Sequence, residues 1–279
     1  MYKQKKAMSK IFPLILFLLA ALNGGRVHGG EPTGTSIQDA TFISERDSTE
    51  QKYVALFPPK YTADEPRDIL IALHGHGSDR WQFIRDPRDE CRAARDVATE
   101  HGMIFISPDY RASTSWMGPA AEADVVQILM ELRKKYRVSE VYICGASMGG
   151  AACLTFAALH PELIDGVASM NGTANFLEYD NFQPAISESF GGAKEEIPLE
   201  YKRRSAEYWP EKLTMPVGLT VSGKDDIVPP QSVLRLAKVL ESAGGDVLLI
   251  YREEEGHATN YADAKAILEY ILKMNNPKK

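Results

Sequence analysis

Short apolar segments alternate with one-sided helical segments along most of this chain, and this alternation limits the fold more than any other feature. Apolar runs such as DILIAL at 68–73 and MIFIS at 103–107 predict buried strands. Residues 120–136 place apolar side chains at helical spacing along one face. Strands that alternate with helices predict an α/β fold with a mostly parallel central sheet and helices on both faces.

The same patterns give the extent of each element. The predicted strands are 51–57, 68–73, 103–107, 140–144, 165–170, 217–222 and 247–251, and the predicted helices are 81–101, 120–136, 148–159, 230–241 and 261–273. Residues 171–212 show neither pattern, and this segment is long enough to form a small cap-like insertion. In a sheet of this kind, functional side chains lie at the carboxyl ends of the strands.

The N-terminal segment 1–29 differs from the rest of the chain. Lysines precede a mostly apolar run from Ile11 to Leu22, and small residues follow it. This run is too short for a membrane-spanning helix, which needs about 20 such residues. We therefore predict a cleaved signal peptide over 1–29, with an uncleaved membrane anchor as the alternative. The remainder, 30–279, is predicted to be one domain that is secreted or periplasmic.

Charge and cysteine content exclude several classes of function. Removing the five basic residues of 1–29 changes the formal charge from −6 to −11. An acidic domain of this kind is not expected to bind nucleic acid, and no stable membrane insertion is expected after signal cleavage. The three cysteines, Cys91, Cys144 and Cys153, lack metal-ligand spacing. Cys144 and Cys153 are expected to fill core, although one disulfide pair stays an alternative.

A nucleophile motif follows the predicted strand 140–144. Residues 145–149 read GASMG, a G-x-S-x-G pattern in which the serine sits on a sharp turn between a strand and a helix. The helix that leaves the turn begins with the small residues of 149–152, which allow close packing. This context predicts Ser147 as a nucleophile, and a purely structural Gly-Ser turn is the alternative.

A serine nucleophile needs a base, and the base needs an acid that fixes its ring tautomer. In strand–turn–helix hydrolases the chain order is serine, acid, histidine. Asp225 and Asp226 follow the predicted strand 217–222, and His257 is the only histidine downstream of both Ser147 and these aspartates. His257 is therefore the predicted base, with Asp225 and Asp226 as candidate acids.

The loop after strand 68–73 reads LHGHGSD and is a candidate for binding a developing oxyanion. Its glycines would let backbone N–H groups turn toward the nucleophile, and we predict the N–H groups of Met148 and His76 as the two donors. The pair His74 and His76 also suggests a metal motif of the form H-x-H-x-D-H. Here the aspartate is displaced by one position, at Asp79, and the rest of the motif is missing, so neither metal nor cofactor is predicted.

From Tyr53 to the C-terminus, the chain resembles the secreted esterase branch of the α/β-hydrolase superfamily. The similar proteins are feruloyl and acetylxylan esterases, polyhydroxybutyrate depolymerase-like proteins, and the catalytic domains of prolyl-oligopeptidase-like enzymes. The segments that carry the resemblance are LHGHGSD, DVVQILMELRKKYRVSEVYICGASMGG, HPELIDGVASMNG, SGKDDIVPP and EGHATN. The resemblance implies a Ser–His–Asp hydrolase without metal or cofactor. Its D-x-x-V-P pattern implies Asp225 as the acid, whereas its commoner G-x-x-D spacing implies Asp226; we predict Asp225.

The resemblance also implies the reaction: hydrolysis of small-molecule or polysaccharide-linked carboxylic esters through an acyl-enzyme intermediate. A serine peptidase of prolyl-oligopeptidase type is one alternative. It is less favoured because the segment 30–67, between the expected cleavage site and the first buried strand, is too short for a gating domain. A non-catalytic binding protein on the same scaffold is the other alternative. Trp116 is a candidate wall of the substrate pocket, with core packing as the competing expectation.

Overall fold

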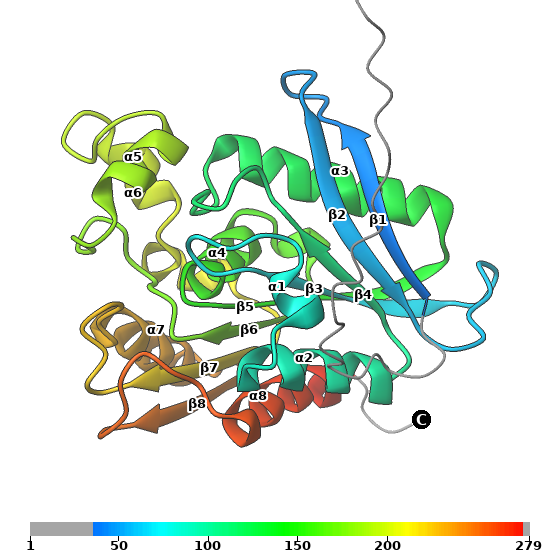
Figure 1. The fold of residues 1–279 in the computed structure, drawn as a ribbon. Coiled ribbons are helices and arrows are strands. Elements are labelled where there is room, and N and C mark those ends of the chain that lie inside the picture. Colours follow the sequence, from blue (N-terminus) through cyan, green and yellow to red (C-terminus); the bar gives the residue numbers. More distant parts are fainter. Residues whose placement is uncertain (1–35, 276–279) are drawn as a thin grey trace, which may run out of the picture. The chain divides into compact units, whose positions relative to one another are not determined.

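A computed structural model describes residues 36–275 of the chain (Figure 1). Its strands are β1 (Ser36–Ile43), β2 (Glu50–Phe57), β3 (Arg67–Leu73), β4 (Ile104–Pro108), β5 (Val138–Ala146), β6 (Gly166–Met170), β7 (Val217–Ser222) and β8 (Val247–Arg252). Its α-helices are α1 (Gln82–Arg85), α2 (Asp89–Glu100), α3 (Pro119–Lys135), α4 (Met148–Leu159), α5 (Gln183–Phe190), α6 (Pro198–Arg203), α7 (Gln231–Ser242) and α8 (Tyr261–Asn275).

One sheet of eight strands holds the fold together, in the order β1-β2-β4-β3-β5-β6-β7-β8. Strands β3 to β8 pair in parallel, and β1 and β2 are added as antiparallel strands beyond β4. The predicted α/β class with a mostly parallel sheet is confirmed. Parallel pairing places the carboxyl ends of β5, β7 and β8 along one edge of the sheet, and the candidate residues follow these ends.

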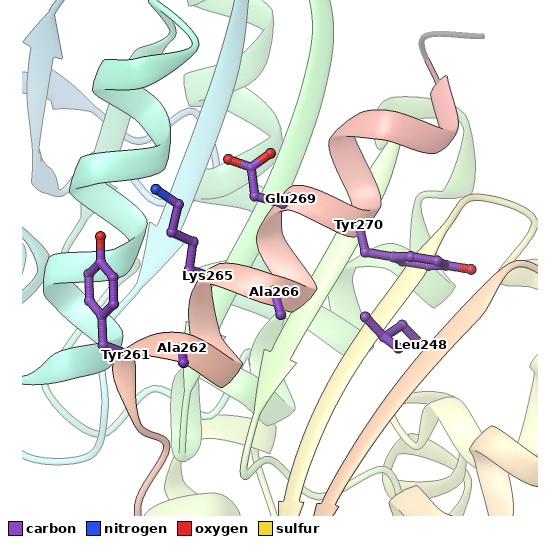
Figure 2. A pocket seen from close by; sticks show the side chains of 7 residues that line it. All are labelled: Leu248, Tyr261, Ala262, Lys265, Ala266, Glu269 and Tyr270. Atoms are coloured by element: carbon purple, nitrogen blue, oxygen red, sulfur yellow. The ribbon is translucent and has the colours of Figure 1, made fainter.

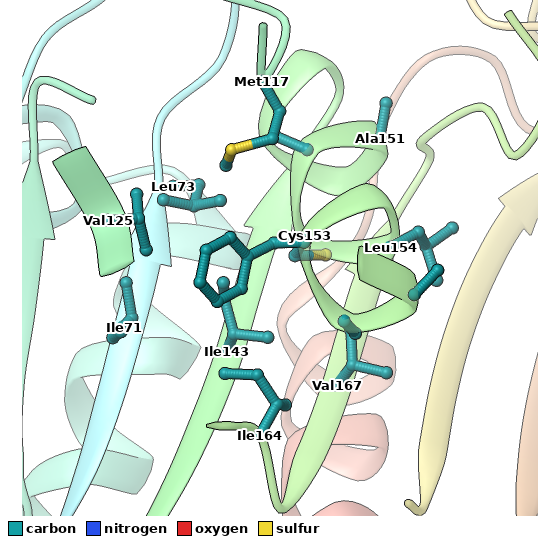
Figure 3. Packing of buried hydrophobic residues seen from close by; sticks show 14 of the residues in the cluster. Ile71, Leu73, Met117, Val125, Ile143, Ala151, Cys153, Leu154, Ile164 and Val167 are labelled. Atoms are coloured by element: carbon teal, nitrogen blue, oxygen red, sulfur yellow. The ribbon is translucent and has the colours of Figure 1, made fainter. Parts of the chain in front are cut away.

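Two apolar layers cover the sheet because side chains alternate along each strand. In β3, Ile69, Ile71 and Leu73 face the layer that includes α3, α4 and α7, whereas Leu70 and Ala72 face the layer of α2 and α8. Figure 3 shows the first layer, where Cys153 and Leu154 of α4 lie over the sheet with Ile143 and Val167. In Figure 1, α2 and α8 run side by side beneath the other face.

Helix α4 has apolar residues on all sides, as expected for a helix that is surrounded by protein. Every residue from Met148 to Ala158 is buried. One side packs on the sheet, and on another side the Thr155 hydroxyl donates to the Arg204 carbonyl oxygen at 2.7 Å. The helix that follows Ser147 is therefore fixed from both the sheet and the segment 171–212.

Three parts of the fold differ from the sequence prediction. The helix predicted over 81–101 is broken into α1 and α2 because Asp86, which precedes Pro87, is extended with ψ 130°. Strand β1 was not predicted because its side chains are mostly exposed on both faces, which leaves no apolar alternation. Residues 171–212, predicted to be irregular, contain α5, α6 and two short 3₁₀ turns.

The predicted signal peptide, 1–29, lies outside the described residues. Within 36–275, no helix combines the length and the apolar character needed to cross a membrane. Cys91, Cys144 and Cys153 are all buried free thiols, as expected for core residues in the case of Cys144 and Cys153. The disulfide alternative is therefore not realised in this structure.

Candidate active site

The turn between β5 and α4 holds Ser147 in a strained conformation. Its φ of 58° and ψ of −120° lie in a region that non-glycine residues seldom occupy, at a cost of about 1–3 kcal/mol. Two backbone hydrogen bonds fix it there. The Ser147 N–H donates to the Met170 carbonyl oxygen at 2.8 Å, and the Ser147 carbonyl oxygen accepts the Ala151 N–H at 3.0 Å. Strain of this kind persists where the surrounding structure imposes it, typically at functional sites.

The two glycines of the G-x-S-x-G pattern allow the turn to close. A Cβ atom on Gly145 would lie 2.3 Å from the Gly149 carbonyl oxygen, and one on Gly149 would lie 1.9 Å from the Leu73 carbonyl oxygen. Both distances are far shorter than any van der Waals contact. Glycine is therefore required at both positions for β5, β3 and α4 to approach one another.

Three side chains from separate strand ends form a continuous hydrogen-bond relay. His257, on the loop after β8, places Nε2 2.9 Å from Ser147 Oγ and Nδ1 2.7 Å from Asp225 Oδ2. The Asp225 side chain is 1% exposed and the His257 side chain 21% exposed. The structure thus brings together the predicted nucleophile, base and acid, with the acid buried and the base accessible from solvent.

The loop after β7 decides between the two candidate acids. Asp225 Oδ1 accepts the backbone N–H groups of Ile227 at 3.0 Å and Val228 at 2.8 Å, which leaves Oδ2 for His257. Asp226 is exposed. Its backbone oxygen accepts a hydrogen bond from Asn181 Nδ2 at 3.1 Å. The structure places Asp225, and not Asp226, against the imidazole.

The predicted oxyanion donors lie on the two segments that meet at the turn. Among the described residues, the backbone N–H groups of Met148 and His76 have no acceptor. The N–H groups on either side of His76 are engaged: that of Gly75 donates to Gln82 Oε1 at 2.7 Å, and that of Gly77 to the Ser113 carbonyl oxygen at 2.8 Å. The loop is thus fixed while the His76 N–H stays available.

His74 is a structural residue of that loop. It is completely buried, with Nδ1 2.9 Å from the Gly75 carbonyl oxygen and Nε2 3.2 Å from the Asp109 carbonyl oxygen. Burial lowers the pKa of its imidazole. Backbone oxygens face both ring nitrogens, and the neutral ring donates to one of them, so the side chain is enclosed by its own loop.

Of the two expectations for Trp116, a pocket wall or core packing, the structure shows core packing. Its side chain is fully buried, so in this structure it cannot touch a substrate. Aromatic rings from the segment 171–212 cover it, with centroids of Phe176, Tyr179 and Phe182 at 6.2, 5.6 and 5.5 Å. Its indole N–H donates to His76 Nδ1 at 3.1 Å. Trp116 therefore supports the oxyanion loop through His76 instead of lining the pocket.

Residues 179–182, predicted only as part of the broad cap 171–212, connect the two sides of the site. The Tyr179 hydroxyl donates to the Ile227 carbonyl oxygen at 3.0 Å, and Asn181 Nδ2 donates to the same oxygen at 2.9 Å. On the other side, the Phe182 ring lies 4.4 Å from the His76 ring. Burial, and then the charge of Asp225, raise the pKa of Tyr179. The many aromatic residues of 171–212 were the only sequence signal that pointed to these residues.

Two hollows of the described surface lie away from Ser147. One, of about 580 Å³, lies on the outer side of α8 and is shown in Figure 2, where Tyr261 and Tyr270 stand at its two ends. The other, of about 670 Å³, lies along α3 and includes Glu122, His160 and Arg203. The arrangement of reactive groups locates the candidate site.

Residues 92–274 match the prolyl oligopeptidase family. No curated protein matches the chain in sequence.

Several solved structures have a similar fold. An S-formylglutathione hydrolase from Agrobacterium tumefaciens is 16% identical, with a TM-score of 0.67, over 89% of this chain and 97% of its own. Fluorophosphonate-binding serine hydrolase F of Staphylococcus aureus is 16% identical, with a TM-score of 0.65, over 85% of this chain and 99% of its own. A Bacteroides ovatus protein assigned as a dipeptidyl aminopeptidase IV is 16% identical, with a TM-score of 0.68, over 86% of this chain. The chain spans 36% of that protein's length.

Proposed function

Because the chain belongs to the prolyl oligopeptidase family of serine hydrolases and has the α/β-hydrolase fold, we propose that it cleaves carboxylic esters. In this proposal Ser147 is the nucleophile, His257 the base and Asp225 the acid. The observation that carries it is the relay from Ser147 Oγ through His257 to Asp225, with contacts of 2.9 and 2.7 Å. Both lengths are within the range that direct proton transfer requires.

The relay supplies each proton transfer of a two-step hydrolysis. Nε2 of His257 accepts the Ser147 hydroxyl proton while Oγ bonds to the ester carbonyl carbon. The tetrahedral intermediate collapses when His257 returns that proton to the leaving alkoxide, which produces the acyl-enzyme. A water molecule, deprotonated by His257, then releases the acid and regenerates the Ser147 hydroxyl. Asp225 keeps the ring proton on Nδ1 and stabilises the imidazolium that forms in each step.

The negative charge of the intermediate falls at the junction of α4 with the loop 74–77. The free N–H of Met148 lies at the first position of α4, where the helix dipole favours an anion. The free N–H of His76 lies on the facing loop. Removing one oxyanion donor costs about 10²- to 10³-fold in kcat in well-studied hydrolases. Two available N–H donors on facing segments fit an acyl-transfer reaction.

An ester is favoured as substrate by the similar structures that match over nearly their whole lengths. The S-formylglutathione hydrolase, which its name places among thioester hydrolases, is covered over 97% of its chain. The similarity to the Bacteroides ovatus dipeptidyl aminopeptidase IV is confined to 36% of that protein. Small-molecule and polysaccharide-linked esters are the proposed substrates.

Peptide hydrolysis is the second candidate, favoured by the family match itself. A matched pair of substrates separates the two: one acyl group presented as a p-nitrophenyl ester and as a p-nitroanilide, with Ser147→Ala as the background. We expect kcat/KM for the ester to exceed that for the anilide by at least about 10³-fold after normalisation to the uncatalysed rates. Equal or greater acceleration of the anilide would make the protein a peptidase.

The proposed location is outside the cytoplasm. The basic head and the short apolar run of the segment 1–29 support export and removal of this segment. An exported hydrolase would meet polymer-linked esters that do not enter the cell. This part of the proposal is independent of the chemistry of the site.

A further inference from the structure

The two ring nitrogens of His76 have different surroundings, and the difference fixes where the ring proton lies. Nδ1 is 3.1 Å from the indole nitrogen of Trp116, which is fully buried. An indole N–H can only donate. Nδ1 must therefore accept, so the ring is neutral and its proton is on Nε2.

The Nε2 edge of His76 is available to a ligand. His76 is half-buried, and within residues 36–275 its Nε2 has no hydrogen-bond partner. Nδ1 faces the buried indole, so Nε2 is the ring nitrogen that remains for a ligand. The Nε2–H group is therefore a fixed donor, and no described residue accepts its hydrogen bond.

The loop that carries this donor lies beside the nucleophile turn. His76 follows Gly75, where a Cβ atom would lie 3.6 Å from the carbonyl oxygen of Ala146, the residue before Ser147. The Phe182 ring, tilted by 45°, covers the imidazole from the segment 179–182. Phe182 has a φ of 55°, which is strained for an aromatic residue, so the surrounding contacts impose its position.

We propose that His76 takes part in catalysis through its side chain: a neutral imidazole, held in the Nε2–H tautomer by Trp116, donates a hydrogen bond to a substrate oxygen beside the scissile bond. This inference rests on the proposed function, because it assumes that the substrate reacts at Ser147. Trp116 is then a positioning residue that acts through His76. The backbone N–H and the imidazole N–H of one residue would serve the same substrate.

The tautomer also makes the donor sensitive to pH. Protonation puts a hydrogen on Nδ1, which then opposes the Trp116 N–H and breaks the contact. Burial lowers the pKa of His76, and no charged side chain adds to this effect. The titratable groups on the elements around it are His74 and Asp79 on its own loop, Tyr179 against Trp116, and His257 in the site. His76 therefore stays neutral to lower pH than an exposed histidine.

Nitrogen-15 NMR of the imidazole rings tests the tautomer without any substrate. We expect the resting His76 ring to show a protonated Nε2 and an unprotonated Nδ1. Trp116→Phe removes the donor, so the titration midpoint of His76 should move to higher pH. Trp209→Phe is the matched control, because it removes an indole N–H that donates to the Lys202 carbonyl oxygen away from the site. A proton on Nδ1, or equal midpoints in all three proteins, would overturn the inference.

Kinetics test the hydrogen bond to the substrate. His76→Leu removes both ring nitrogens, and we expect kcat/KM for p-nitrophenyl acetate and the rate of fluorophosphonate labelling to fall about 10- to 100-fold. His76→Asn keeps an acceptor for Trp116 and an N–H donor, so it should stay within about tenfold of the original rates. Circular dichroism checks that both variants fold.

The two hypotheses fail in different ways. If Ser147 does not react with the fluorophosphonate, the proposed function is wrong whatever His76 does. If Ser147 reacts and His76→Leu labels at the unchanged rate, the proposed function stands and the role of the imidazole is refuted.

Discussion

Replacing Asp225 with asparagine tests the relay because three hydrogen bonds dictate how the new side chain must sit. Oδ1 accepts the N–H groups of Ile227 and Val228, so the amide oxygen must take that place. The amide nitrogen then faces Nδ1 of His257, which can only accept from it. The ring proton moves to Nε2, where it points at Ser147 Oγ and prevents the ring from accepting the hydroxyl proton.

With the proton on Nε2, His257 can no longer act as a base, although the geometry of the site is unchanged. In the well-studied triads the equivalent change lowers kcat about 10⁴-fold, which corresponds to about 5 kcal/mol of transition-state stabilisation. The fold should be little affected, because asparagine has the same shape and keeps both backbone contacts. Asp226→Asn is the matched control: its side chain is exposed, and we expect a change in kcat of less than about tenfold.

Steady-state hydrolysis of p-nitrophenyl acetate by the two variants gives the comparison, with thermal unfolding as the check on stability. An Asp225→Asn protein that folds and keeps more than about a tenth of the original kcat would refute the account of the relay. A larger loss in Asp226→Asn than in Asp225→Asn would move the acid to Asp226.

Three further predictions concern packing, pH and processing. Gly149→Ala would place a Cβ 1.9 Å from the Leu73 carbonyl oxygen, and we expect urea unfolding to show a loss of about 3 kcal/mol or more; an unchanged midpoint would contradict the packing argument. Hydrogen bonding to Asp165, burial and the nearby charge of Asp68 raise the pKa of Glu140 from 4.5 to about 7. The folded protein therefore holds this proton more tightly than the unfolded chain, and stability should fall by about 1 kcal/mol, after solvent screening, as the pH rises from about 4.5 through 7. Glu140→Gln should flatten this fall, and a variant with the original pH profile would exclude Glu140 as its cause. Sequencing the protein recovered from its native host should find an N-terminus near Gly30, and a start at Met1 would argue against signal cleavage.

The predicted and observed bounds agree best for elements that a short stretch of sequence specifies by itself. The run 217–222 ends at a glycine turn, and β7 has the predicted bounds. Helix α4 also has the predicted bounds, 148–159. The predicted helix 81–101 failed because its periodicity continues across Pro87 while the backbone cannot. Strand β1 has no apolar face of its own and depends on pairing with β2, which single-sequence patterns do not report.

In the site, too, features set by chain order could be predicted, whereas features set by distant contacts could not. Chain order alone singled out His257, because no other histidine follows both Ser147 and the aspartates. The choice of acid depended on which of two adjacent carboxylates turns inward, and the backbone contacts of Asp225 decide that. Trp116 was ambiguous because its burial depends on the rings of Phe176 and Tyr179, which belong to a distant segment of the chain.

Labelling with a fluorophosphonate, followed by mass spectrometry of the modified peptide, tests the central claim most directly. We expect one adduct, on Ser147, that forms with the loss of esterase activity. Ser147→Ala should neither label nor hydrolyse p-nitrophenyl acetate, while its circular dichroism is unchanged. An adduct on another serine, or a Ser147→Ala protein that keeps the original activity, would contradict it.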